Sequence, residues 1–302
     1  MEKINHIAQS EGWRKAVETI VAVKAPSRAR YIRDFFRADW RFLFPLQPEW
    51  RILDIGAGWG SLSVALASLC REVIALESVL ERARFIQFRI QQDAISNVCA
   101  IHGNLASPPL SPNRFDLATM NGVLEWLGWS DLSLNTRSVQ LDLLRQVFQL
   151  LKPGGHLYIG IENRFAISYW LGAMDHNYLS YTSLLPRPLA HLATHLISGH
   201  PYRTYTYSPI GYRSLLKQAG FSEIDFYGVM PTYSRPVNYW PLGDGIPLQR
   251  FSNVLFSEKP NGLSWRSKLV QKLVEAAPAS LVGFSSRFLA PHLLITARKG
   301  AH

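Results

Sequence analysis

Cysteine is scarce in this chain, and its scarcity excludes some classes of protein. The 302 residues include two cysteines, Cys70 and Cys99, which form no CxxC pair. Two cysteines are too few for the disulfide framework of a small secreted domain. The sequence also lacks the pattern of a signal peptide, so we expect a cytoplasmic protein.

Long apolar runs, internal repeats and low-complexity tracts are missing as well. No run approaches the roughly 20 apolar residues that a membrane span needs, so we expect a chain that does not cross a membrane. Contact of its basic amino-terminal segment with the inner face of a membrane is left open. Hydrophobic residues make up 47% of the chain and charged residues 18%, a balance typical of globular proteins.

Basic residues outnumber acidic ones. Lys and Arg number 32 against 22 Asp and Glu, which gives a formal net charge of +10. This excess favours anionic partners, among them nucleic acids, phosphorylated molecules and acidic membrane surfaces, without choosing among them.

Strands and helices are expected to alternate from Arg51 onward. Strands separated by helices predict a mostly parallel sheet covered on both faces, a Rossmann-like α/β fold. We expect a helical segment at 1–48 and one domain at 49–302, with aromatic insertions at about 163–208 and 231–285. The seven expected strands cover 51–56, 72–77, 98–104, 115–122, 156–162, 222–230 and 291–299, and the expected helices cover 61–70, 79–92, 138–151, 209–219 and 265–277.

Three alternating glycines follow the first expected strand, in the stretch LDIGAGWGSLS from Leu53 to Ser63. Ligands of open α/β sheets bind at the carboxyl ends of the strands, and glycines there let a nucleotide approach the backbone. The dinucleotide fingerprint is GxGxxG, but here the third glycine comes one position early and Ser61 takes its place. The GxGxG spacing therefore disfavours an NAD-linked oxidoreductase.

Together with three further segments, this loop resembles the class I S-adenosylmethionine (SAM)-dependent methyltransferases. The segments are Glu77 at the end of the second strand, MNGVLEWL (Met120 to Leu127) after the fourth, and LLKPGGHLYI (Leu150 to Ile159) leading into the fifth. The resemblance covers roughly residues 50–161 and resumes more weakly toward the carboxyl terminus. It implies a methyltransferase enzyme that uses SAM as its cofactor.

The resemblance also implies the contacts to the cofactor. Glu77 matches the acid that accepts hydrogen bonds from both ribose hydroxyls, and the GNL segment ending at Leu105 matches the segment beside the adenine. The family usually has Asp where this chain has Asn104. The expected cofactor-binding residues are Asp54, Gly56, Gly58, Gly60, Glu77, Ser78, Asn104, Leu105 and Asn121.

The absence of several sequence motifs narrows the range of possible methyl acceptors. Methylases of exocyclic amines in nucleic acids resemble one another in a [DN]PP[FYW] motif after strand four, where this chain reads MNGV. Cytosine-C5 methylases need a cysteine that typically follows proline, and neither cysteine here does. Two cysteines cannot build the CxxxCxxC cluster of radical SAM enzymes. Methylation of nucleic-acid bases is therefore disfavoured, whereas methylation of ribose or of an atypical RNA is left open.

Tyrosines crowd the first insertion and the region after it. Eleven of the twelve tyrosines fall between Tyr158 and Tyr239. Aromatic faces interspersed with Arg, Asp, Asn and His suit a sugar or a phosphorylated acceptor, and an aromatic lid packed for stability is the alternative. The expected substrate-binding residues are Asn163, Arg164, Tyr178, Tyr181 and Arg203. The alternative for the two arginines is a structural or solvated role.

Three side chains are candidates for catalysis. Methyl transfer to a hydroxyl group needs aligned reactants, exclusion of water and a general base. His176, next to Asp175, can take a proton near neutral pH, and Glu162 and Glu125 follow the fifth and fourth strands. The alternatives are a structural histidine and a helix-start acid. We expect no metal, because the pair His191 and His195 lacks a third ligand.

The lid also loosely resembles methyltransferases of bacterial cell-surface polysaccharide and glycoconjugate pathways. We therefore expect SAM-dependent O-methylation of a sugar, a glycoconjugate precursor or a secondary metabolite. Methylation of an amine or of a phosphate oxygen on a small molecule is left open, as is a non-catalytic partner of another enzyme. The sequence does not indicate the oligomeric state.

Overall fold

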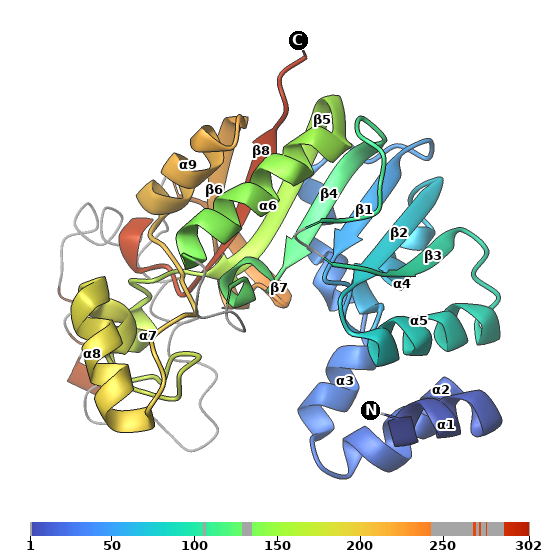
Figure 1. Ribbon diagram of the computed structural model, residues 1–302, viewed down its shortest axis with the longest axis horizontal. Helices are drawn as coiled ribbons and strands as arrows, with labels where there is room; N and C mark the ends of the chain where they lie inside the picture. The colour runs from blue at the N-terminus through green and yellow to red at the C-terminus, as the bar shows by residue number, and fades with distance from the viewer. Residues whose placement is uncertain are drawn as a thin grey trace.

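A mixed β-sheet of an α/β fold forms the centre of the molecule (Figure 1). The computed structural model describes residues 2–104, 107–128, 135–242 and 287–301, together with 268, 269, 272 and 276. Its eight strands run in the order β3-β2-β1-β4-β5-β8-β6-β7. Their bounds are β1 Arg51–Ile55, β2 Glu72–Glu77, β3 Val98–His102, β4 Phe115–Asn121, β5 Leu151–Glu162, β6 Ser222–Thr232, β7 Arg235–Pro241 and β8 His292–Arg298. The expected fold class is confirmed, with eight strands among the described residues in place of the seven expected.

The first five strands are parallel, and the last three are antiparallel to their neighbours. β1 and β4 are neighbours and pair with Asp54 opposite Thr119. From this pair the chain proceeds outward through β2 to β3 on one side and to β5 on the other, where β8 then lies between β5 and β6. The point between them is the topological switch point, where open α/β sheets bind their ligands.

The additional strand is β7, which lies in the insertion expected at about 231–285. It carries Pro236 and Pro241, and proline weighs against a central strand because it lacks a backbone N–H. Among the described strands, β7 lies at the edge of the sheet and pairs with β6 alone, so its prolines are tolerated.

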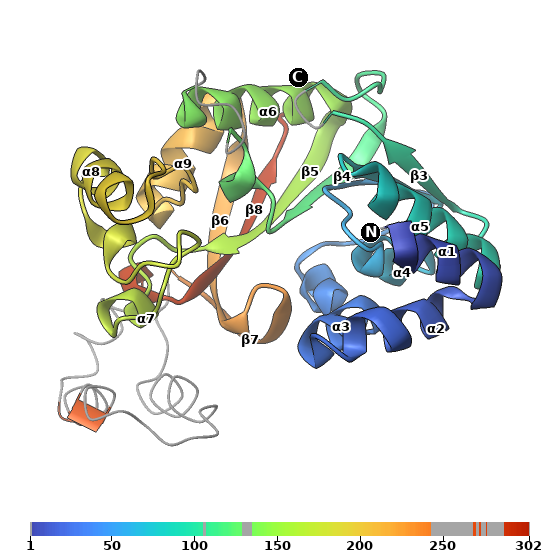
Figure 2. The same ribbon diagram turned by 60° about the horizontal axis from the view of Figure 1, so that its bottom comes forward.

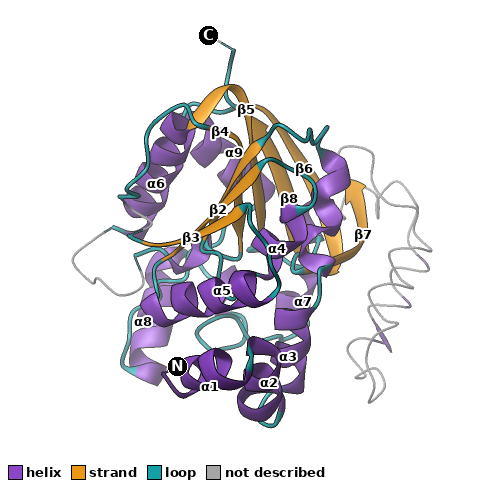
Figure 3. Ribbon diagram, turned by 90° about the vertical axis from the view of Figure 1, so that its right-hand side faces the viewer, coloured by secondary structure: helices purple, strands orange, loops and turns teal. Residues whose placement is uncertain are grey.

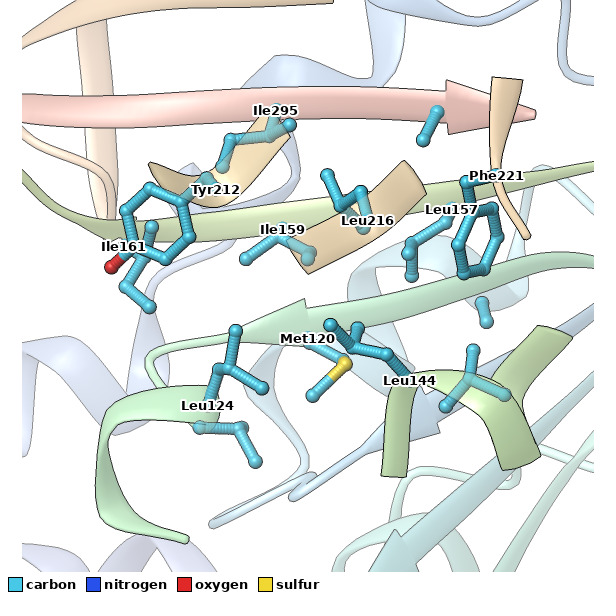
Figure 4. Packing of buried hydrophobic residues seen from close by; sticks show 14 of the residues in the cluster. Met120, Leu124, Leu144, Leu157, Ile159, Ile161, Tyr212, Leu216, Phe221 and Ile295 are labelled. Carbon is cyan, nitrogen blue, oxygen red and sulfur yellow. The ribbon is translucent and has the colours of Figure 1, made fainter. Parts of the chain in front are cut away.

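Helices cover both faces of the sheet (Figure 3). α4 (Ser61–Ala67) packs against β2 and the 3₁₀ helix η2 (Phe36–Leu43), and α5 (Leu80–Gln92) packs against β2 and β3. α6 (Thr136–Leu150) packs against β5, and α9 (Pro209–Gln218) against β6. Figure 4 shows this second layer, where apolar side chains of α6 and α9 meet those of the sheet. The labelled residues are Met120, Leu124, Leu144, Leu157, Ile159, Ile161, Tyr212, Leu216, Phe221 and Ile295.

The helices expected in the first 48 residues are present. They are α1 (Glu2–Glu11), α2 (Trp13–Ala16), the π-helix η1 (Val17–Ala22), α3 (Pro26–Arg33) and η2 (Phe36–Leu43). The apolar residues of α1, α2, η1 and α3 form a separate cluster with Phe85 of α5, whereas Trp40 of η2 belongs to a cluster of the sheet. Arg89 of α5 is 1% exposed and donates to the Ile32 carbonyl at 2.9 Å, which ties α5 to α3. The domain boundary at residue 48 stays a prediction.

The insertion after β5 contains more regular structure than its composition predicts. It holds α7 (Ile167–Trp170), the 3₁₀ helix η4 (Thr182–Leu184) and α8 (Arg187–Ser198). In Figure 2, α7 and α8 lie on one side of the molecule and α1 to α3 on the other. Most of the helix expected at 265–277 falls outside the described residues. None of the described helices combines the length and hydropathy that crossing a lipid bilayer requires.

Candidate functional site

The glycine loop lies between β1 and α4, at the switch point. Gly56, Gly58 and Gly60 all have positive φ, at 67°, 61° and 74°, a backbone conformation that glycine adopts without steric cost. The backbone N–H groups of Gly56 and Ala57 donate to the Leu76 carbonyl at 2.8 and 3.1 Å. The loop is therefore fixed against β2.

Glu77 ends β2 directly beside this loop. Its side chain is 3% exposed. Oε2 accepts the N–H of Gly58 at 2.7 Å, and Oε1 accepts the N–H of Val79 at 2.9 Å. Each carboxylate oxygen can accept two hydrogen bonds, so each of the two oxygens can still accept one hydrogen bond from a ligand.

Asp54 lies behind the loop, within β1. Its buried carboxyl group accepts the Ser63 hydroxyl at 2.6 Å and the Thr119 hydroxyl at 3.0 Å. Burial raises the pKa of Asp54 from 3.8 to about 6, although the two hydroxyl hydrogen bonds act in the opposite direction. Both oxygens thus bond to the protein and brace β1 against α4 and β4, and a contact of Asp54 with the cofactor stays a prediction.

The other predicted cofactor residues follow neighbouring strands. Ser78 and Asn104 are exposed after β2 and β3, and Leu105 lies outside the described residues. Asn121 ends β4 and is 6% exposed. Arg37 of η2 donates from Nη2 to the Asn121 carbonyl oxygen at 2.9 Å, so the amino-terminal segment reaches this end of the sheet.

Two observations support the prediction that a polar ligand such as the expected cofactor binds here. Among the described residues, a Cβ at Gly58 would meet nothing nearer than the Gly56 carbonyl oxygen at 3.9 Å, so this side of the loop is open. Both polar atoms of the Asn121 amide are buried and find no hydrogen-bond partner in the described part of the chain. Buried polar groups are normally satisfied, and a ligand at the end of β4 would satisfy these.

The three predicted catalytic side chains come together from three elements. Glu125 belongs to the 3₁₀ helix η3 (Leu124–Trp126) after β4, Glu162 ends β5, and His176 lies in the loop after α7. One carboxylate oxygen of each glutamate and one ring nitrogen of the histidine all lie within 4.8 Å of one another. Glu125 is 0% exposed and Glu162 8%. We call these three residues the acidic cluster, and their role in catalysis stays a prediction.

Burial and mutual charge set the protonation of this cluster. Burial raises the pKa of Glu125 well above its ordinary value, and the charge of Glu162 adds to the rise. Burial also acts to raise the pKa of Glu162, but the contact with His176 outweighs it, so that pKa lies below its ordinary value. Burial acts to lower the pKa of His176, but Glu162 raises it overall.

Asp175 does not orient His176. Its carboxylate accepts the Asn177 N–H at 2.8 Å and the Thr182 hydroxyl at 2.6 Å. Glu162 takes the place beside the imidazole, with Oε2 3.2 Å from Nε2 of His176. The indole of Trp126 also lies against the imidazole, at 4.7 Å between ring centroids.

Sequence reasoning missed three side chains near this cluster. They are Arg37, Tyr233 between β6 and β7, and His292 at the start of β8. The ring of Tyr233 lies 5.5 Å from that of His292, and both Tyr233 and Arg37 interact electrostatically with Glu125. No spacing in the sequence links these three segments. The density of tyrosines is a signal for Tyr233 alone.

The predicted substrate-binding arginines bond to the protein itself. Arg164 donates to the carbonyl oxygens of Ser183 at 2.9 Å and Leu185 at 2.6 Å, and Arg203 donates from Nε to the carbonyl of Gly128 at 2.7 Å. These contacts hold the insertion together and attach it to the segment after η3. Binding of a substrate anion by either arginine stays a prediction.

Of the remaining predicted lid residues, one is buried and two are exposed. Asn163 is 0% exposed and donates to the Ala290 carbonyl at 2.9 Å. Tyr178 and Tyr181 are 84% and 41% exposed, so their rings are accessible to an acceptor. A surface hollow of about 610 Å³ among residues 33–41 and 65–69 touches neither the loop glycines nor the acidic cluster.

The part of the chain that builds the loop matches a known family. Residues 53–159, from β1 into β5, match the family model described as "Methyltransferase domain". Ubiquinone biosynthesis O-methyltransferase of Xanthomonas campestris pv. campestris is 26% identical over 144 residues, 48% of this chain and 55% of that protein. Phosphoethanolamine N-methyltransferase 1 of Triticum aestivum is 27% identical over 146 residues, 47% of this chain and 27% of that protein. The chain spans about half the length of the first relatives that it matches.

Solved structures share the fold. Phosphoethanolamine N-methyltransferase 2 of Haemonchus contortus, in complex with phosphomonomethylethanolamine and S-adenosylhomocysteine, matches with a TM-score of 0.52 at 13% identity. The match covers 97% of this chain and 59% of that one. At this identity the likeness shows the fold alone.

Proposed function

Because this chain belongs to the class I SAM-dependent methyltransferase superfamily, whose cofactor is SAM, we propose that it transfers a methyl group from SAM to a hydroxyl oxygen of a small molecule. The observation that carries this proposal is the pairing of the glycine loop with Glu77. Three glycines with positive φ follow β1. The Glu77 carboxylate at the end of β2 accepts the backbone N–H of the middle glycine, Gly58, at 2.7 Å.

The cofactor is proposed to lie along the carboxyl ends of β1, β2 and β4. Glu77 accepts the ribose hydroxyls with the acceptor directions that Gly58 and Val79 leave open. The open side of Gly58 lets the cofactor approach the backbone, and the Asn121 amide bonds its polar end. Ser78, Asn104 and Leu105 are proposed to border the adenine. SAM supplies a methyl group on a positively charged sulfur and leaves as S-adenosylhomocysteine.

The acceptor hydroxyl is proposed to lie against the acidic cluster. In the transfer, a C–O bond forms while the S–CH₃ bond breaks with its electron pair left on sulfur, and the hydroxyl proton departs. Glu125, Glu162 and His176 place two carboxyl groups and an imidazole where that proton leaves. The burial of the two glutamates limits access of water, which strengthens electrostatic interactions with the acceptor.

A sugar or glycoconjugate precursor is the acceptor class that we propose. The exposed rings of Tyr178 and Tyr181 can stack on a sugar face, and they belong to the insertion that also carries His176. The similarity to ubiquinone biosynthesis O-methyltransferase supports oxygen as the acceptor atom.

A phosphorylated amine is the second candidate, favoured by the similarity to phosphoethanolamine N-methyltransferases. A non-catalytic methyltransferase-fold partner is the remaining alternative. Transfer of labelled methyl groups from SAM tests all three, with nucleotide sugars, lipid-linked saccharides and phosphoethanolamine offered as acceptors and the Glu77→Ala variant as the control. Label on a saccharide supports the proposal, label on phosphoethanolamine supports the second candidate, and SAM binding without transfer to any acceptor favours the partner protein.

A further inference from the structure

We propose that Glu125, Glu162 and His176 bind a divalent cation. The site itself rests on the geometry of the acidic cluster, whereas its role in activating an acceptor hydroxyl rests on the proposed function. The cation revises the expectation that the protein holds no metal, which was based on His191 and His195. Of that pair, His191 instead contacts the Tyr205 hydroxyl at 2.8 Å.

The spacing of the three groups suits a shared ion. One ligand atom from each side chain lies within 4.8 Å of the other two. His176 Nε2 and Glu162 Oε2 are 3.2 Å apart. Two ligands at right angles on one ion, with bonds of about 2.1 Å, are separated by about 3 Å. The observed pair is close to this separation.

Within the described part of the chain, the same atoms make no other hydrogen bond of good geometry, although they are buried. Neither oxygen of Glu125 makes a hydrogen bond of good geometry among the described residues, although the Tyr233 hydroxyl interacts with this carboxyl group. The Glu125 side chain is 0% exposed. Glu162 Oε2 and His176 Nε2 are close in distance, but their contact lacks the geometry of a hydrogen bond. Buried polar groups are normally hydrogen-bonded, and buried charges are normally paired or bound to metal, so these atoms point to a cation between them.

The nearby arginine does not replace that cation. Arg37 interacts electrostatically with Glu125, but its Nη2 donates to the Asn121 carbonyl. No salt bridge joins either glutamate of the cluster to an Arg or Lys in the described ranges. In the described part of the chain, two carboxyl groups and an imidazole therefore face one another without a salt bridge to a basic side chain.

The donor set indicates the kind of ion and its role. Two carboxylate oxygens and one imidazole nitrogen suit Mn²⁺, Fe²⁺ or Zn²⁺ better than Mg²⁺ or Ca²⁺, which prefer oxygen ligands alone. Three protein ligands leave coordination positions open for an acceptor hydroxyl, whose proton is then lost more easily. His176 is in this arrangement a ligand, not the general base that the sequence suggests.

Metal binding to the untagged full-length protein tests the site directly. The protein is freed of metal with a chelator and titrated with Mn²⁺ in a calorimeter, with electron paramagnetic resonance reporting free Mn²⁺, and Zn²⁺ is titrated in parallel. We expect one ion per chain with micromolar affinity. Glu125→Gln and His176→Ala should each weaken binding at least tenfold, whereas the matched control Glu49→Gln, at an exposed glutamate, should leave it unchanged.

Absence of saturable binding of both ions up to millimolar concentration would overturn the inference, as would equal binding by all variants. The cluster would then be held by a shared proton. Circular dichroism establishes that the variants fold, and because the two substitutions lie in different elements, one folded variant suffices. SAM titrations of the same samples separate the two proposals: SAM binding without metal binding rejects the cation alone, and metal binding without SAM binding rejects the proposed function alone.

Discussion

The Glu77 carboxylate accepts the backbone N–H of Gly58 at 2.7 Å, which joins the end of β2 to the middle of the glycine loop. Neither residue alone distinguishes a nucleotide site from an ordinary tight turn. Together they place a buried anion beside an open stretch of backbone, at the switch point of the sheet. Substitutions of these two residues therefore test the proposed cofactor site.

Glu77→Ala should weaken SAM binding at least tenfold. The substitution removes the proposed hydrogen bonds to the ribose, each worth about 1.5–3 kcal/mol at a charged acceptor, and tenfold corresponds to about 1.4 kcal/mol. Titration calorimetry measures the loss. Glu72→Ala, at the other end of β2, is the matched control and should bind normally. Unchanged affinity in Glu77→Ala would show that this carboxylate does not face the cofactor.

Gly58→Ala should impair SAM binding more than it impairs folding. An alanine there has open space but a positive φ, which costs about 1–2 kcal/mol. Gly199 has a similar φ of 74° and no neighbour within 4 Å among the described residues, so Gly199→Ala should lose comparable stability and keep SAM affinity. Gly56→Ala should lose more stability than either, because its Cβ would lie 2.6 Å from Val123 Cγ2. Equal SAM affinity in Gly58→Ala and Gly199→Ala would argue against cofactor approach at Gly58.

Asp54 should make stability depend on pH. Its pKa is about 6 in the folded protein against an ordinary 3.8, so the folded state binds the proton more tightly. The resulting stabilisation is present below about pH 4 and is lost as the pH rises to about 6. Relative to Asp54→Asn, which does not titrate, the wild type should lose about 1–3 kcal/mol of unfolding free energy across this range. Urea unfolding at pH 4.5 and 7 measures the difference, and parallel curves for the two proteins would contradict it.

Arg164→Ala should destabilise the insertion at about 163–208, which we call the lid. The change removes two hydrogen bonds to the carbonyl oxygens of Ser183 and Leu185, and an unsatisfied carbonyl costs about 1–3 kcal/mol. Proteolysis should therefore cut the insertion faster in this variant. Arg137→Ala serves as the control, because that arginine bonds the exposed Gln218 side chain. Equal cleavage rates in the two variants would mean that Arg164 does not hold the lid.

Much of the core was predictable, because its signals are local. β1, β2 and β4 are short apolar runs with turn residues behind them, and the structure has them within a residue or two of the predicted bounds. β7 was not predictable, since its prolines disfavour a strand and its pairing with β6 depends on its place at the sheet edge. α8 was missed because its apolar Leu192 and Leu196 are exposed, which blurs the pattern of a helix packed on a core.

The candidate site, like the fold, was predictable only in part. The glycine loop and Glu77 lie on consecutive elements, so their spacing along the chain predicts their proximity. Each member of the acidic cluster could be nominated from its place after a strand or in the lid. That Glu125, Glu162 and His176 meet is a consequence of tertiary structure, because the insertion must fold back over β4 and β5. The contribution of Arg37, which comes from the amino-terminal segment, is likewise invisible in sequence spacing.

Cofactor binding by the purified protein tests the central claim most directly. Calorimetric titration with SAM, S-adenosylhomocysteine and NADH compares the two nucleotide classes on one sample. The account predicts micromolar binding of the first two and none of NADH. Absence of binding by SAM and its product, or tight binding of NADH, would contradict it.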